Sequence, residues 1–194
     1  MTPRGHRVLL SRRQFLGFLA LLPWSLKIIA ADETAETPEI PDVRLMDSGG
    51  SEHRLPELLA QGPVIISFFY TRCTSFCPMQ TALMRNVQAH LQRRHAPGLL
   101  LSISLDPSND TPDALAAYAA KFKTQVGLPQ QWLLLTGEEP ALNRVWRAFD
   151  SATGRPEDHA ATLWIGCAAK QRWSRQFGLP GVQQLMAAMQ AVSA

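Results

Sequence analysis

Cysteine is scarce in this sequence, with three among 194 residues, which excludes a small domain stapled by several disulfides. Long apolar runs are lacking too. The longest, Phe15–Ile29, is shorter than the roughly 20 residues of a membrane-spanning helix and is broken by Pro23 and Lys27. There is no internal repeat and no low-complexity tract. With 46% hydrophobic and 18% charged residues, the chain is expected to form one globular domain plus additional segments.

The net charge of +3 is distributed unevenly along the chain. Residues 1–31 contain five basic residues and no acid, whereas the remaining 14 basic and 16 acidic residues give −2. The five basic residues are Arg4, Arg7, Arg12, Arg13 and Lys27. The rest of the chain therefore offers no electrostatic reason to bind nucleic acid.

Residues 1–31 predict an export signal. The basic stretch Arg4–Arg13 precedes the apolar run, and Ala30-Ala31 supply small residues for cleavage, although isoleucine at the minus-three position fits poorly. Ser11–Leu16 (SRRQFL) resembles the twin-arginine export signal, while adjacent arginines also occur in ordinary secretory signals. We expect export to the bacterial periplasm, with a removed signal favoured over a retained membrane anchor. Residues 32–41 are expected to be an acidic linker.

Cys73 and Cys77 lie at a predicted corner between a strand and a helix. Val64–Tyr70 is a β-branched and aromatic run typical of a buried strand, and Pro78 suits the first position of the helix that follows. The start of a helix favours thiolate over thiol. The C-x-x-x-C spacing is one residue wider than in thioredoxin, so the pair can close as a disulfide or hold a metal ion. Two inert buried cysteines remain an alternative.

Strands and helices alternate through residues 42–194. A short hairpin is expected at residues 43–55. Strands are expected at Val64–Tyr70, Leu99–Leu105, Trp132–Leu135, Ala161–Gly166 and Gln171–Ser174, and helices after Pro78, from Pro112 with Thr111 as cap, over Glu138–Phe149 and after Pro180. This alternation predicts an α/β domain, with a mostly parallel sheet flanked by helices and an N-terminal β-hairpin extension. Such an order agrees with a thioredoxin-like fold.

Two thiolates rarely complete a metal site, and His159 is the candidate for a third ligand. It lies in a polar loop before the strand at Ala161–Gly166, and in a thioredoxin-like topology this loop faces the cysteine corner. The other four histidines fall in the signal, in the hairpin and near the far end of the cysteine-bearing helix: His6, His53, His90 and His95. A single loop histidine is more often a solvated side chain than a ligand, so only the topological argument favours ligation by His159.

Three acidic residues are candidates for a role around the site. Asp158 is placed to orient the ring of His159, or it is a solvated loop residue. Asp106 and Asp110 either form an acidic docking edge or serve as turn and near-cap residues.

Three sulfur-containing residues are expected to stay outside the metal site. Met79 and Met84 fall within an apolar helix pattern and are interpreted as core residues rather than metal ligands. Cys167 ends a buried strand, where it is expected to be an inert small hydrophobic residue.

Four ordered motifs extend over the predicted domain: FFYTRCTSFCPMQ at 68–80, SISLDPSNDTPDALAAYAAKF at 102–122, WLLLTG at 132–137 and DHAATLWI at 158–165. Together, over about residues 40–192, they resemble the Sco/SenC copper-binding proteins, which assist assembly of the copper centre of cytochrome c oxidase. The resemblance implies a thioredoxin-like fold and copper ligation by Cys73, Cys77 and His159. Trp164 stands where the family usually has tyrosine, and residues 166–169 (GCAA) replace a turn that usually contains aspartate.

The leading hypothesis is therefore a metallochaperone that passes copper to an oxidase subunit or another envelope cuproprotein. Two thiolates and one imidazole can hold copper as Cu(I) or Cu(II), while structural zinc normally takes four protein ligands. The alternative is a thiol-disulfide oxidoreductase, in which Cys73 and Cys77 form the redox pair and His159 is dispensable. That activity would also need a thiol-disulfide reductant. Peroxide removal is a third hypothesis, without a recognisable peroxidatic motif. Membrane contact is expected only through the N-terminal segment.

Overall fold

The computed structural model describes residues 33–34, 37–151 and 154–194, all within one unit spanning Ala31–Ala194. The predicted export signal lies outside the described residues. Part of the expected linker is instead a strand of the sheet, because Glu33–Thr34 form β1 and pair with β8. None of the described helices is both long and apolar enough to cross a membrane.

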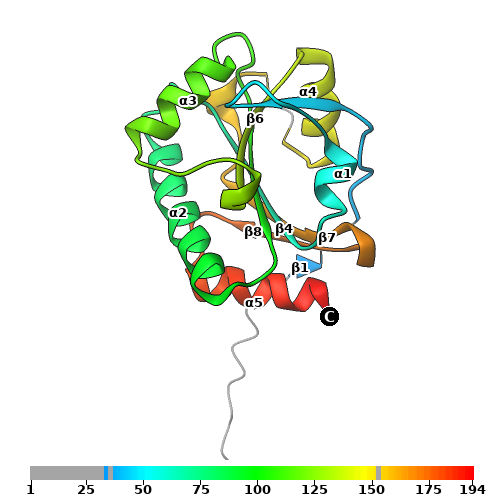
Figure 1. Ribbon diagram of the computed structural model, residues 1–194. Helices are drawn as coiled ribbons and strands as arrows, with labels where there is room; N and C mark the ends of the chain where they lie inside the picture. Colours follow the sequence, from blue (N-terminus) through cyan, green and yellow to red (C-terminus); the bar gives the residue numbers. More distant parts are fainter. Residues whose placement is uncertain (1–32, 35–36, 152–153) are drawn as a thin grey trace, which may run out of the picture. The chain divides into compact units, whose positions relative to one another are not determined.

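An eight-stranded sheet forms the centre of this unit, in the order β1-β8-β7-β4-β5-β6-β2-β3 (Figure 1). The strands are β1 (Glu33–Thr34), β2 (Arg44–Asp47), β3 (Glu52–Arg54), β4 (Val64–Phe69), β5 (Leu99–Ser104), β6 (Trp132–Thr136), β7 (Thr162–Cys167) and β8 (Arg172–Phe177). The β2–β3 hairpin extends the sheet beyond β6, which confirms the predicted N-terminal hairpin.

The sheet is mixed, so the expectation of a mostly parallel sheet holds only for β4, β5 and β6 and is wrong elsewhere. β7 runs antiparallel to β4, with Leu163 opposite Ser67 and Gly166 opposite Val64. A continuous hydrophobic run carries no information on strand direction, because both faces are covered in either case. The antiparallel pairing places the start of β7 beside the end of β4. Residues just before β7 therefore reach the edge of the sheet from which the cysteine loop leaves.

Helices cover both faces of the sheet. They are α1 (Leu55–Leu59), α2 (Phe76–Arg94), α3 (Pro112–Lys121), α4 (Glu139–Ala148) and α5 (Val182–Ser193), with 3-10 turns at Leu128–Gln130, Pro156–Asp158 and Ala168–Lys170. α1 and α4 lie on one side of the sheet, and α2, α3 and α5 on the other (Figure 1). Their buried residues form two separate cores. The predicted Thr111 cap is confirmed, since its hydroxyl accepts a hydrogen bond from the Ala114 N–H at 3.2 Å.

The central strand β4 supplies side chains to both cores by alternation. Ile66 and Phe68 face the core under α1 and α4, while Ile65 and Phe69 face the core under α2 and α5. All six residues of the strand are buried, as predicted. The segment after Phe69 therefore starts from a rigid position.

The buried face of α2 differs from the prediction. Met84 is 1% exposed, as expected for a core residue, but Met79 is 52% exposed, so its interpretation as a core residue is wrong. Residues four apart in an α-helix are offset by about 40° around its axis. Over the three steps from Leu91 back to Met79 the offset adds up, so Met79 no longer lies on the inner face. Cys77, together with the polar residues Gln80 and Thr81, occupies the inner face there instead.

Gly166 in β7 is required by close packing. A Cβ atom at this position would overlap the indole ring of Trp173, which is itself buried and packed against Phe149 and Trp164. We expect Gly166→Ala to lower the free energy of unfolding by roughly 3 kcal/mol, as measured by urea denaturation. Gly154→Ala is the matched control, because nothing lies within 4 Å of a Cβ there. An equal loss in both variants would contradict the steric explanation.

Candidate metal centre

The structure brings Cys73 and Cys77 together at the start of α2. Ser75 occupies the cap position of the helix and Cys77 its second residue. The backbone N–H of Cys77 donates to the Cys73 sulfur at 3.4 Å, and the Ser75 hydroxyl lies 3.8 Å from the same atom. Both cysteines are buried and neither forms a disulfide. The predicted corner between strand and helix is thus confirmed, although the helix begins two residues before Pro78.

The two thiols differ in acidity. Partial burial opposes ionisation of Cys73, but hydrogen bonds from Cys77 and Ser75 outweigh it and lower the pKa of Cys73 to about 7. Burial and the neighbouring Cys73 raise the pKa of Cys77 to about 12. At pH 7 the Cys73 thiol is therefore about half ionised, whereas Cys77 keeps its proton.

This difference predicts selective alkylation of the reduced, metal-free protein. The thiolate is the nucleophile, so the rate at Cys73 should rise about a hundredfold from pH 5 to pH 8 and level off above its pKa of about 7. Cys77, with a pKa of about 12, should stay unreactive over this range. Iodoacetamide labelling followed by peptide mass mapping measures both. Faster labelling of Cys77 than of Cys73 would contradict the assignment.

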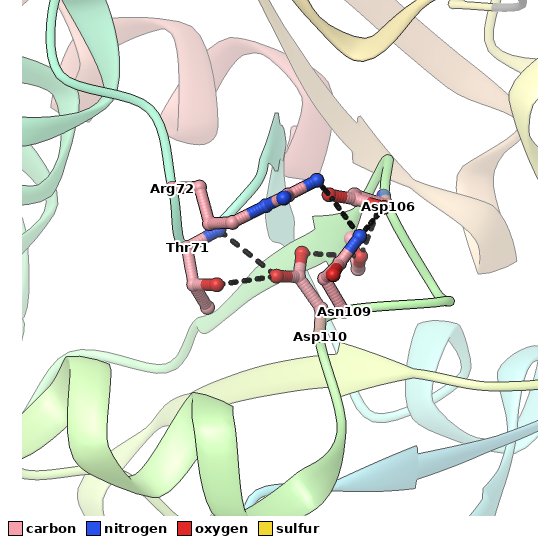
Figure 2. Close-up of polar contacts among 6 residues, drawn as sticks. Thr71, Arg72, Asp106, Asn109 and Asp110 are labelled. Carbon is pink, nitrogen blue, oxygen red and sulfur yellow. Dashed lines mark hydrogen bonds and ion pairs between the residues drawn. The ribbon is translucent and has the colours of Figure 1, made fainter.

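Asp110 anchors the loop that carries Cys73 (Figure 2). Its carboxylate accepts hydrogen bonds from the N–H and hydroxyl of Thr71, at 3.0 and 2.6 Å, and from the Ser104 hydroxyl at 2.6 Å. Asp110 is fully buried, and this burial raises the pKa of its carboxyl group. The first residues after β4 are thereby tied to the end of β5.

A second contact between the same segments involves Arg72. Its guanidinium pairs with Asp106 at 2.8 Å, and Asn109 donates to both carboxylate oxygens of Asp106 (Figure 2). Asp106 and Asp110 are both buried, so of the two interpretations made from the sequence the turn and near-cap role fits them, not the docking edge.

His159 lies just before β7, at the same edge of the sheet as the cysteine loop. Its Nδ1 lies 2.6 Å from the Pro156 carbonyl oxygen. A carbonyl only accepts, so Nδ1 carries the proton and Nε2 keeps its lone pair. That Nε2 atom is buried and has no hydrogen-bond partner in the described part of the chain. Asp158 does not orient the ring, because its carboxylate pairs with Arg155 at 2.8 and 2.9 Å.

Tyr70 stands beside both halves of the site. Its ring meets the ring of His159 edge-on, with centroids 6.3 Å apart. Burial, the charge of Cys73 and a hydrogen bond with that thiol raise the pKa of Tyr70 to about 12. Across residues 33–34, 37–151 and 154–194, no group of three or more His, Cys, Asp or Glu side chains is close enough to hold a metal ion. As the structure places them, Cys73 and Cys77 are paired, and His159 lies beside Tyr70 at the same edge of the sheet.

The remaining sulfur and imidazole groups lie away from this edge. Cys167 is buried at the far end of β7 and packs in the core, as expected. His53 pairs with Asp47 at 2.7 Å in the hairpin, and His90 and His95 belong to the last turns of α2. Sequence reasoning assigned no role at the site to Tyr70, although it is the last residue of the predicted strand and part of the first motif.

Residues 31–163 match the family model described as SCO1/SenC. The chain belongs to the SCO1/SenC family. A curated relative, the SCO1 protein homolog of Bacillus subtilis (strain 168), is 31% identical over 99 residues. This alignment covers 48% of each chain, so the present chain spans about half the length of that relative.

Two solved structures are similar in fold to this SCO1/SenC protein. BsSco, a member of the Sco family of cytochrome c oxidase assembly proteins in which a disulfide switch was identified, has a TM-score of 0.68 at 22% identity, covering 81% of this chain and 94% of its own. Copper-bound ScoI of Bradyrhizobium japonicum has a TM-score of 0.62 at 20% identity, covering 77% and 96%. At these identities the likeness concerns the fold alone, and it confirms the predicted thioredoxin-like α/β class.

The donor set of this SCO1/SenC protein fits a copper ion. Two adjacent sulfurs suit Cu(I), and imidazole accepts both oxidation states of copper. A histidine whose Nδ1–H is held by a carbonyl has the tautomer of a metal ligand bound through Nε2. Its Nε2 is buried at the same edge as the two thiols, without a partner in the described ranges, so a lone pair is available there for a metal ion.

Proposed function

We propose that this chain is a copper chaperone in which Cys73, Cys77 and His159 bind one copper ion. Assembly of the copper centre of cytochrome c oxidase is the role in which it would act. The observation that supports this most directly is the buried Nε2 of His159, which has no hydrogen-bond partner among the described residues and lies at the edge where the two thiols are paired. An unsatisfied buried polar atom costs about 1–3 kcal/mol, so a native protein retains one where it has a use.

Ligation by all three residues requires a small rearrangement, because the His159 ring packs edge-on against Tyr70 and the described side chains do not form a metal-holding group of three as they are placed. His159 follows a turn whose other residues, Gly154–Asp158, are mostly exposed. The contacts described for this turn are local, such as the hydrogen bond from Asp158 N–H to the Arg155 carbonyl at 3.1 Å. Movement of the ring toward the sulfurs would therefore disturb little of the core.

Three protein ligands leave room on the metal for a ligand from the recipient, which permits handover. Exposed apolar side chains near this edge suit docking of a partner protein. Of the four exposed large hydrophobic side chains in the described residues, three lie near this edge: Met79, Phe177 and Leu179. Phe177 pairs with Thr162 at the start of β7. The recipient we propose is an oxidase subunit or another cuproprotein of the envelope.

The proposed location is the bacterial periplasm. The twin-arginine motif at Ser11–Leu16 supports export of the folded protein, with a retained inner-membrane anchor as the alternative. In an oxidising envelope the cysteine pair needs either a metal or a thiol-disulfide reductant to stay in a defined state.

A thiol-disulfide oxidoreductase is the second candidate, favoured by the unequal acidity of the thiols. The Cys73 thiolate would attack a substrate disulfide and expel one substrate thiolate. Cys77, losing its proton, would then displace the second, which leaves a Cys73–Cys77 disulfide and a reduced substrate. A thiol reductant must then restore the pair. His159→Ala separates the two functions, since it should abolish copper-dependent oxidase assembly but leave disulfide reduction intact.

Titration of the reduced protein with Cu(I) tests the proposal directly. One equivalent should bind against a competing chromophoric chelator, and the Cu(II) form should show sulfur-to-metal charge-transfer absorption. Failure of the wild-type protein to bind copper would refute the chaperone function and leave the dithiol function.

A further inference from the structure

Gln80 is a buried polar residue of α2 whose amide nitrogen is unpaired within the described residues. It is 3% exposed, and its side-chain Nε2 has no hydrogen-bond partner among the residues that the structure describes. Gln88, on the same helix and 5% exposed, shows the usual solution, since its Nε2 donates to the carbonyls of Gln125 and Gln130, both at 2.7 Å. Burial of an amide donor without an acceptor is unfavourable, so the contrast within one helix requires an explanation.

The position of Gln80 relates it to the metal centre. It lies three residues after Cys77, and both belong to the buried face of α2. Side chains in an α-helix lean toward its N-terminus and cover the preceding turn. The amide of Gln80 is therefore directed over the turn that contains Cys77.

A metal-bound Cys77 would need such a donor. Cys77 is 0% exposed, so water cannot solvate its sulfur once the thiol loses its proton to bind a metal ion. Hydrogen bonds to a ligating thiolate offset the cost of burying its charge and tune the site.

We propose that the Gln80 amide donates a hydrogen bond to the Cys77 sulfur when copper is bound, and that it stays unpaired in the metal-free protein so that this donor is in place. The inference rests on the proposed function, because it presupposes that Cys77 becomes a metal-bound thiolate. Gln80 is thus a positioning residue for the thiolate, placed outside the three proposed ligands.

Gln80→Met tests this with two measurements of opposite sign. Methionine keeps the shape of the side chain but removes the unpaired amide, so the reduced metal-free variant should melt roughly 2–4 °C above wild type. Its Cu(I) affinity, measured by chelator competition, should fall about tenfold or more. The matched control Gln88→Met loses two hydrogen bonds, so it should melt roughly 4–8 °C lower and bind Cu(I) as wild type does.

Only the combination of higher stability and weaker binding supports the proposal. A Gln80→Met variant that melts at or below the wild-type temperature would show that the amide already has a structural role, and unchanged Cu(I) affinity would show that it does not serve the metal. If wild-type protein fails to bind Cu(I), the proposed function fails first, and the melting temperatures still show whether the amide is unpaired.

Discussion

Replacing either Cys73 or Cys77 by serine is expected to weaken Cu(I) binding at least about a thousandfold, equivalent to about 4 kcal/mol. Each substitution removes one of only two soft donors, and a hydroxyl oxygen is a poor ligand for Cu(I). The two cysteines are in direct contact, since the Cys77 N–H donates to the Cys73 sulfur, so loss of either sulfur removes a donor from the same site. Chelator competition at fixed pH, with the protein kept reduced, measures the affinities.

Cys167→Ser is the matched control, because Cys167 is also free and buried but lies at the other end of β7. It should bind Cu(I) as tightly as wild type. His159→Ala should lower the affinity by a smaller factor, roughly tenfold to a hundredfold, and should remove Cu(II) binding more completely, because imidazole is the donor suited to the oxidised ion. Full affinity in Cys73→Ser, or an equal loss in Cys167→Ser, would contradict the proposed ligand set.

The cysteine corner could be predicted from the sequence because each of its parts is local. A buried strand, a short loop and a helix start are all encoded within residues 64–80, and the structure shows β4, the loop and α2 in that order. The Thr111 cap was predictable for the same reason. Patterns of this kind depend on neighbours in the chain, which a single sequence contains in full.

Relations between distant segments were harder to predict. The approach of His159 to the cysteine edge depends on β7 running antiparallel to β4, a direction that hydrophobicity does not encode. The ring of Tyr70 beside His159 is a packing outcome with no signal in the spacing. Met79 was misplaced because four-residue spacing drifts around the helix, and Asp110 had two interpretations until its burial was known.

Asp110→Ala is expected to lower the free energy of unfolding by roughly 3 kcal/mol or more, because three donors lose their acceptor at once. These are the N–H and hydroxyl of Thr71 and the hydroxyl of Ser104. Urea denaturation measures the loss. The matched control is Asp113→Ala, an exposed residue in the first turn of α3, which should change stability by no more than about 0.5–1 kcal/mol. Equal losses would contradict a special role for the buried carboxylate.

Asp110→Asn removes the ionisable carboxyl group at this position but keeps the size and shape of the side chain. Burial raises the pKa of Asp110 in the folded protein above 3.8, so the folded state holds the proton over a pH range in which the unfolded state has released it. The contribution of Asp110 to stability should therefore fall as pH rises through that range. Asparagine does not titrate, so the stability lost on substitution should be larger near pH 4 than at pH 7. If the stability lost on substitution does not depend on pH, the carboxyl group titrates normally. If the loss is larger near pH 4 than at pH 7, the fold retains a buried acid at an energetic cost, and this acid holds the cysteine loop in place.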